Sequence, residues 1–156
     1  MVDLRLEPMT EEQYQRYRAS AEEGYARQIA EAGELTPVDA AERAAREFAK
    51  LLPEGLDTAD NLFFQGYSGD TEVGMVWVAL STKSDGVRAW IYDIVVEEVH
   101  RRRGYGRAIM RALEDECRAR QVTSIGLNVF GGNDGARALY EQEGYGVTQT
   151  QMRKYL

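Results

Sequence analysis

The first third of the chain carries apolar residues at helical spacing. Between residues 10 and 52 they recur every three or four positions in two stretches, which predicts two helices. Thr10 and Gln13 form a capping-box pair at the start of the first helix, and Gly33 is placed to end it. Pro37 suits the first turn of the second helix. We therefore expect a pair of helices, each of which can bury one apolar face.

Runs typical of strands lie before this helical pair and continue after it. They are expected at residues 2–6, 62–67, 73–80, 87–96, 124–130 and 147–155. Two further helices are expected at about residues 104–120 and 134–143. Residues 68–70, Ser-Gly-Asp, are typical of a hairpin connection. The resulting order, β-α-α-β-β-β-α-β-α-β, predicts an α/β (α+β) fold with a mixed sheet flanked by helices.

Residues 94–107, IVVEEVHRRRGYGR, join an apolar strand to the start of a helix through a charged link. Main-chain N–H groups in the first turn of a helix have no intrahelical partner, and Gly104 and Gly106 have no side chains to obstruct close approach to them. The helix dipole adds partial positive charge at this end. Full positive charges come from Arg101, Arg102, Arg103 and Arg107. This combination suits a phosphate or pyrophosphate group.

The same stretch resembles a known family signature. Arg101, Gly104 and Gly106 match the R/Q-x-x-G-x-G/A pattern of the GNAT superfamily of acyl-CoA-dependent N-acetyltransferases. A second family pattern, N-x-x-A-x-x-L-Y-x-x-x-G-F/Y, follows in the expected order. It is met by Asn133, Ala136, Leu139, Tyr140, Gly144 and Tyr145. Two motifs in register are far more specific than either one alone.

The resemblance implies the GNAT fold, with a mixed, mostly antiparallel sheet of about six to seven strands. In that fold the strands that follow the first motif and precede the Asn-bearing helix splay apart and admit acetyl-CoA. The pantetheine arm is then expected along the strand end, and the phosphates at the helix start. The residues expected to contact this co-substrate are Val95, Val96, Arg101, Arg102, Arg103, Gly104, Tyr105, Gly106, Arg107 and Asn133.

Tyr140 is the candidate general acid, because its Leu-Tyr pair stands where the resembling family places it. A thiol has a pKa of about 8.5 and a tyrosine a pKa of about 10, so a positioned hydroxyl can assist departure of the thiolate. The alternative is an ordinary core aromatic packed beside Ala136.

Asp93 is the candidate general base. It shares one predicted strand face with Ile91 and Val95, so its carboxylate should be partly buried and its pKa raised. A base is wanted because an alkyl ammonium with a pKa of about 10.4 leaves on the order of one molecule in a thousand uncharged at neutral pH. We expect Asp93 to act through a water. The alternative is a structural aspartate hydrogen-bonded to a neighbouring backbone group or tyrosine.

Composition narrows the classes of partner. A chain of 156 residues is expected to form one domain, residues 1–156. A net charge of −7 argues against nucleic-acid binding and weakly favours cationic partners. One cysteine and one histidine cannot supply a typical zinc shell, so no metal site is expected. The longest apolar run, residues 75–80, is too short to span a membrane, and the N-terminus lacks the apolar core of a signal peptide. We expect a cytoplasmic protein.

These features predict an N-acetyltransferase that passes acetyl from acetyl-CoA directly to a primary amine in a ternary complex. The acidic charge and a tyrosine-rich face on the first helix favour a small cationic amine as acceptor. A protein N-terminus or lysine is the alternative acceptor, and a non-catalytic acyl-CoA-binding regulatory module is the alternative function. The family resemblance also suggests a homodimer.

Overall fold

Five strands and four α-helices make up the residues described by the computed structural model, 2–33 and 35–156. In chain order they are β1 (Arg5–Pro8), α1 (Glu11–Glu31), α2 (Pro37–Leu51), β2 (Asn61–Ser68), β3 (Thr71–Lys83), β4 (Gly86–Val96), α3 (Tyr105–Ala119), β5 (Val122–Leu127) and α4 (Asp134–Gln142). Two short 3₁₀ turns, η1 (Gly55–Asp57) and η2 (Glu98–His100), precede β2 and α3. The chain divides into two compact units, Met1–Gly126 and Leu127–Leu156.

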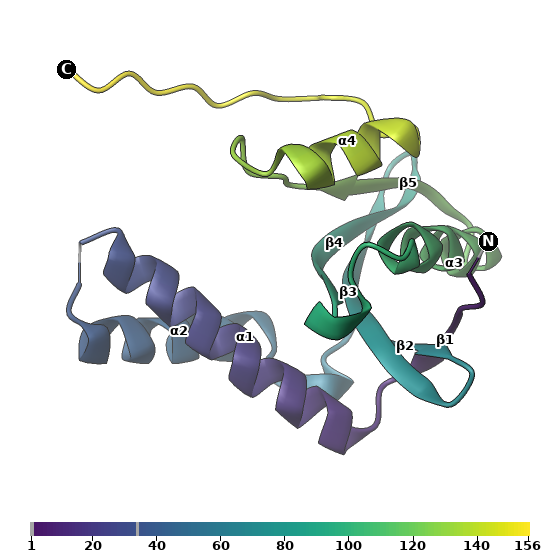
Figure 1. The fold of residues 1–156 in the computed structure, drawn as a ribbon, viewed down its shortest axis with the longest axis horizontal. Helices are drawn as coiled ribbons and strands as arrows, with labels where there is room; N and C mark the ends of the chain where they lie inside the picture. The colour runs from purple at the N-terminus through teal and green to yellow at the C-terminus, as the bar shows by residue number, and fades with distance from the viewer. Residues whose placement is uncertain (1, 34) are drawn as a thin grey trace. The chain divides into compact units, whose positions relative to one another are not determined.

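The sheet has the strand order β1-β2-β3-β4-β5 (Figure 1). The first three pairings are antiparallel. β5 runs parallel to β4, because Thr123 donates to the Val87 carbonyl at 3.0 Å while Gly126, three residues later, lies against Trp90. The sheet is therefore mixed and mostly antiparallel, as the sequence predicts.

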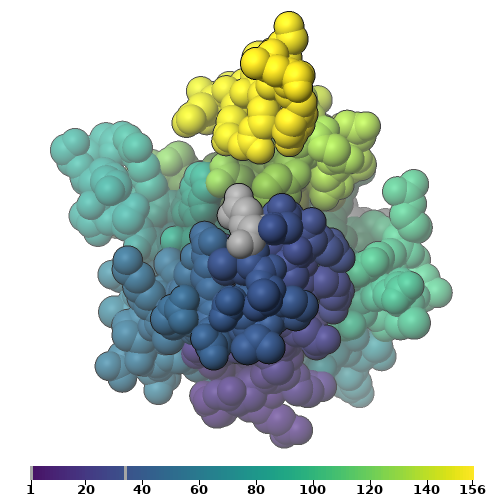
Figure 2. Space-filling model, turned by 90° about the vertical axis from the view of Figure 1, so that its left-hand side faces the viewer, coloured from purple at the N-terminus to yellow at the C-terminus, as the bar shows by residue number. Residues whose placement is uncertain are grey.

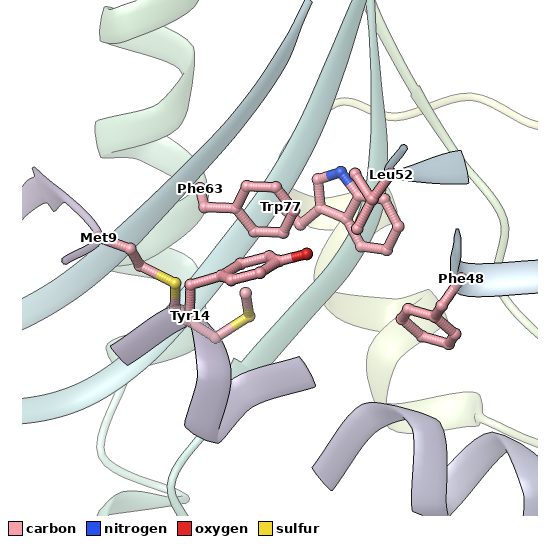
Figure 3. Packing of buried hydrophobic residues seen from close by; sticks show 7 residues of the cluster. Met9, Tyr14, Phe48, Leu52, Phe63 and Trp77 are labelled. Carbon is pink, nitrogen blue, oxygen red and sulfur yellow. The ribbon is translucent and has the colours of Figure 1, made fainter. Parts of the chain in front are cut away.

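Helices cover both faces of the sheet. Neighbouring strand residues face opposite sides, and on β3 Trp77 belongs to the apolar cluster formed with α1 and α2. Figure 3 shows this cluster, with Tyr14 of α1 and Phe48 of α2 near Phe63 and Trp77 of the sheet. In Figure 2 the atoms of α1 and α2, coloured purple to blue, form the surface that faces the viewer.

Local signals explain where the helices begin. Thr10 caps α1, since the Gln13 amide donates to its hydroxyl at 3.2 Å and the Thr10 amide donates to the Gln13 side chain at 3.0 Å. Thr36 caps α2, with Pro37 as its first residue. Both helix starts confirm the expectations from the sequence.

Two glycines on neighbouring strands let α3 approach the second face of the sheet. Gly66 of β2 pairs with Gly74 of β3. A Cβ on Gly74 would lie 2.9 Å from Ile109 Cδ1 of α3, and a Cβ on Gly66 would lie 3.5 Å from Ile109 Cγ1. Because Gly74 also pairs with Val96, the last residue of β4, this close approach holds α3 near the end of β4.

The prediction of a last strand at residues 147–155 is wrong. Residues 147–155 adopt no regular structure, and Val147, Met152 and Tyr155 are exposed. The polar run from Thr148 to Gln151 gives such a strand little apolar surface to bury, which removes the main energy of sheet formation. The described residues thus form five strands, fewer than the six to seven expected.

Candidate active site

A β-bulge in β4 sets the direction of Asp93. Trp77 pairs with Asp93 but Val78 pairs with Ile91, so Tyr92 is an extra residue without a partner in this register. Trp77 and Val78 face opposite sides of the sheet, and their partners must do the same. The prediction that Asp93 shares a face with Ile91 is therefore wrong, because a period of two does not reveal a bulge. Asp93 does share its face with Val95, which pairs with Met75.

Asp93 is half-buried beneath the helical pair and bonded to it. The Tyr17 hydroxyl of α1 donates to Asp93 Oδ2 at 2.7 Å. Burial raises the pKa of Asp93, while the hydrogen bonds from Tyr17 and from the Ile94 amide act in the opposite direction. Burial and the Asp93 charge together raise the pKa of Tyr17, so this phenol keeps its proton. The expected partial burial of Asp93 and the raised pKa are both confirmed.

Aromatic rings surround this carboxylate. The Trp77 ring stacks on Tyr92, with ring centroids 4.6 Å apart, and on Phe63 at 5.2 Å. Tyr92 is about half exposed and Trp77 is buried, so the rings run from the core toward solvent. Such rings offer an apolar and cation-binding surface next to a negative charge.

The end of β4 presents its main chain in two directions. The Glu97 amide donates to the Val73 carbonyl at 2.9 Å, so by alternation the main-chain groups of Val95 also point toward β3. Those of Val96 point to the outer edge, where Arg101 Nε donates to the Val96 carbonyl at 3.0 Å. Of the two valines predicted to meet pantetheine, only Val96 has main-chain groups on this outer edge. The Arg101 side chain was predicted to contact phosphate, but it is hydrogen-bonded to the end of β4.

The link between β4 and α3 leads into a helix start whose first main-chain amides have no intrahelical partner. Arg102 and Gly104 both have left-handed backbone angles, with φ of 64° and 89°. Gly104 is the N-cap of α3, and as a glycine it has no side chain with which to cap the helix amides. The first main-chain bond of the helix runs from the Ala108 amide to the Gly104 carbonyl at 3.1 Å. The amides of Tyr105 and Gly106 thus precede the hydrogen-bonded turns and lie at the positive end of the helix dipole.

A hollow of about 480 Å³ lies beside this helix start. Its charged lining consists of Arg103, Arg107 and Arg111, and Val2, Gly104 and Ala108 complete it. Arg103 and Arg107 were expected at the phosphate site. Arg111 was missed, although it follows Arg107 by four residues and so lies on the same helix face.

The second unit carries the other two predicted site residues. Asn133 is the N-cap of α4, and its Oδ1 accepts a hydrogen bond from the Ala136 amide at 3.3 Å. Tyr140 lies on α4, with its ring centroid 6.1 Å from that of Tyr145. Gly144, with φ of 94°, ends this helix region, as the second motif predicts.

Among residues 2–33 and 35–156, no group of three or more histidine, cysteine or acidic side chains could hold a metal ion. Cys117 is buried on α3, where burial raises the pKa of its thiol, so it is a poor nucleophile. No helix in the described part of the chain is both long and apolar enough to cross a membrane.

The chain is similar in sequence and fold to known proteins. Residues 26–145 match the Acetyltransferase (GNAT) family. The chain is 31% identical over 154 residues to YycN of Bacillus subtilis (strain 168), described as an uncharacterized N-acetyltransferase, covering 98% of this chain and 99% of YycN. It is 28% identical over 152 residues to YdgE, from the same organism and described in the same words, covering 97% of each chain. The crystal structure of YycN superposes with a TM-score of 0.89 over 99% of both chains. The chain therefore belongs to the GNAT family of N-acetyltransferases, whose co-substrate is an acyl-CoA.

Proposed function

We propose that this enzyme transfers the acetyl group of acetyl-CoA to a small cationic amine, by direct attack in a ternary complex. The observation that carries the proposal is the carboxylate of Asp93, half-buried at the β4 bulge and hydrogen-bonded by Tyr17. It lies three residues before Val96, where β4 ends and the arginine-rich link to α3 begins. The proposed proton acceptor and the anion-binding start of α3 are thus joined by one short segment of the chain.

The start of α3 is suited to the diphosphate of the co-substrate. The amides of Tyr105 and Gly106 stand at the positive end of the helix, and the Gly104 cap leaves them uncovered by a side chain. Arg103 and Arg107 line the adjoining hollow, and Arg111 extends the positive charge along the helix. Two phosphates carry charge that these groups would neutralise.

The chemistry assigns one step to each candidate residue. The amine nitrogen attacks the thioester carbonyl carbon, and the Asp93 carboxylate accepts the proton that the nitrogen loses, directly or through a water. When the tetrahedral intermediate collapses, the C–S bond breaks and its electron pair stays on sulfur. The Tyr140 hydroxyl donates a proton to that sulfur, so CoA leaves as the thiol. The outer edge of β4 near Val96 is the expected source of a main-chain donor for the oxyanion.

A cationic acceptor fits the surroundings of Asp93. The carboxylate attracts an ammonium group, and the half-exposed Tyr92 ring, stacked on Trp77, offers it a cation–π contact. The net charge of −7 adds a weak attraction at long range. A protein N-terminus or lysine remains the second candidate acceptor.

The direct test follows thiol release from acetyl-CoA in the presence of primary amines. The panel should contain alkyl diamines, aromatic ethylamines, lysine-containing peptides and peptides with free N-termini. Release that requires both acetyl-CoA and an amine is expected, with small diamines or aromatic amines ahead of peptides. Tight acetyl-CoA binding with no transfer to any member of the panel would instead favour a regulatory acyl-CoA-binding module.

Charge reversal at the helix start should weaken co-substrate binding. Arg103→Glu replaces an attraction for phosphate by a repulsion, and we expect the dissociation constant for acetyl-CoA to rise more than about tenfold, which corresponds to about 1.4 kcal/mol. Isothermal titration calorimetry at about 0.15 M salt, where the Debye length is about 8 Å, measures it. Arg118→Glu makes the same charge change in the last turn of α3 and should leave the affinity within about twofold of the unmodified value. Equal affinities for the two variants would contradict the phosphate site.

Removing the Tyr140 hydroxyl should slow the loss of the thiolate. We expect Tyr140→Phe to lower kcat by about tenfold or more, with little change in acetyl-CoA affinity, because general acid catalysis contributes about 10²-fold or more. Steady-state thiol release and calorimetry separate the two quantities. Tyr155→Phe, at an exposed tyrosine of the same unit, is the matched control. If Tyr140→Phe turns over like the unmodified enzyme, Tyr140 is not the acid.

A further inference from the structure

We propose that Tyr17 is a positioning residue for Asp93, whose hydroxyl fixes the carboxylate in one orientation and keeps it in the anionic form that accepts a proton. The inference deepens the proposed function and rests on it, because it takes Asp93 as the base. It adds to that function a residue from a different element, α1.

The geometry makes Tyr17 a rigid donor. Tyr17 and Asp93 are 76 residues apart in the chain, yet their side-chain oxygens are 2.7 Å apart. The Tyr17 ring packs against Phe63 of the sheet, with centroids 6.2 Å apart. One turn earlier on α1, Tyr14 is fully buried and meets the same Phe63 ring edge-on at 5.0 Å. α1 is thereby held on the sheet, and the Tyr17 hydroxyl has little freedom to leave Asp93.

In the hydrogen bond between Tyr17 and Asp93, the tyrosine is always the donor. The raised pKa of Tyr17 means that the phenol holds its proton throughout the pH range in which an amine is acetylated. Tyr17 can therefore donate to the carboxylate but cannot replace it as the base. An aspartate side chain is short, so fixing Oδ2 also fixes where its other oxygen points.

Few of the groups around Asp93 can stabilise its carboxylate form. Trp77 lies opposite on β3, Tyr92 precedes it on β4, and Tyr14 accompanies Tyr17 on α1, and none of these is an acidic or basic residue. Two cations flank Tyr17 on α1, and each has another partner. Arg18 donates to the Tyr14 hydroxyl at 3.1 Å, and Arg16 pairs with Glu72 at 3.2 Å. The groups that favour the Asp93 carboxylate over the acid are the Tyr17 hydroxyl and the Ile94 amide.

The first test needs no acceptor. We would label the aspartate side-chain carbons with ¹³C and follow the Asp93 carboxyl signal by NMR as the pH changes, with Asp93→Asn identifying the signal. In Tyr17→Phe the titration of Asp93 should move to higher pH, because the carboxylate loses a donor. Tyr67→Phe is the matched control, since it also removes a bonded phenol, whose oxygen accepts from Gln13 Nε2 at 2.6 Å. A titration that stays in place in Tyr17→Phe would overturn the proposal.

The second test uses the amine that the acetyl-transfer panel identifies as best. In Tyr17→Phe the acid limb of the kcat/KM profile should shift to higher pH, with a loss that is largest in the acid range and shrinks as pH rises. A loss equal at all pH values would indicate packing alone and overturn the positioning role. Failure of the underlying function looks different, because Asp93→Asn would then keep the acid limb of the unmodified enzyme.

A folding defect in Tyr17→Phe would not leave the question open. In the unmodified chain, the Tyr17 hydroxyl proton should be protected from exchange with water and should show an NMR cross-peak to the Asp93 carboxyl carbon. A rapidly exchanging hydroxyl without that cross-peak would overturn the proposal.

Discussion

Asp93→Asn is expected to lower kcat/KM for the amine by about 10²- to 10⁴-fold, the range that a positioned general base contributes. Asparagine has nearly the same shape as aspartate, and its side-chain oxygen can still accept from Tyr17. It cannot take a proton from the ammonium group to release the amine that attacks, and it cannot attract the cation by charge. The acid limb of the pH profile should disappear with the base that produces it.

Two measurements separate this loss from other causes. The dissociation constant for acetyl-CoA should be unchanged, because Asp93 faces the helical pair and the phosphate site is at α3. Asp70→Asn, an exposed aspartate in the β2–β3 turn, makes the same substitution and should keep full activity. Full activity in Asp93→Asn as well would leave Asp93 with a structural role only.

The same variant should be more stable than the unmodified chain at neutral pH. Burial raises the pKa of Asp93 in the folded chain, so folding disfavours the carboxylate relative to the acid. Below the unfolded-state pKa the side chain is protonated in both states, and the two chains should differ least. Between the unfolded-state pKa and the raised folded-state pKa, the unfolded chain releases this proton and the folded chain keeps it, so the difference in unfolding free energy should grow with pH. Above the raised pKa the difference should stay constant. Urea unfolding from the acid range to neutral pH measures it, and the opposite trend would mean that the folded chain favours the carboxylate.

Features predicted correctly from the sequence depend on residues close together in the chain. The Thr10 capping box and the α2 start at Pro37 are set by one turn of helix, and both lie where predicted. The start of α3 is another local feature, and Gly104 is its N-cap. The left-handed backbone angle of Gly104, which glycine adopts at little cost, was not predicted.

Features that depend on pairing across the sheet were predicted less well. The bulge at Tyr92 follows from the register between β3 and β4, and a single strand's pattern does not contain that register. The partnership of Tyr17 and Asp93 has the same origin. The sequence placed a tyrosine on a helix face and a carboxylate on a strand, and only the packing of α1 on the sheet brings them to 2.7 Å.

The hydrogen bond to a tyrosine also shows why the two interpretations of Asp93 could not be separated from sequence. A structural aspartate and a catalytic base both require burial and a fixed partner. The structure supplies both features, and they are compatible with either role. The distinction is chemical, so the activity and pH profile of Asp93→Asn decide it.

Gly74→Ala is expected to reduce the unfolding free energy by about 3 kcal/mol or more, near the upper end of the cost of overpacking a core. The new Cβ would lie 2.3 Å from the Val95 carbonyl oxygen and 2.9 Å from Ile109 Cδ1. The first clash is with main chain, which no side-chain rotation relieves, so β4 must move away from β3. Urea unfolding measures the loss. Because Gly74 pairs with Val96, the displaced strand end should also weaken acetyl-CoA binding.

Other glycines calibrate this prediction with the same substitution. A Cβ on Gly66 would come no closer than 3.4 Å to its neighbours, so Gly66→Ala should cost far less although it faces the same Ile109. Gly24 lies inside α1 with nothing within 4 Å, and Gly24→Ala should raise the unfolding free energy by up to about 1 kcal/mol. If Gly74→Ala proved as harmless as Gly66→Ala, α3 would not be held at the end of β4 by this close contact. Other contacts of α3 with the sheet would then fix the position of the anion-binding helix start.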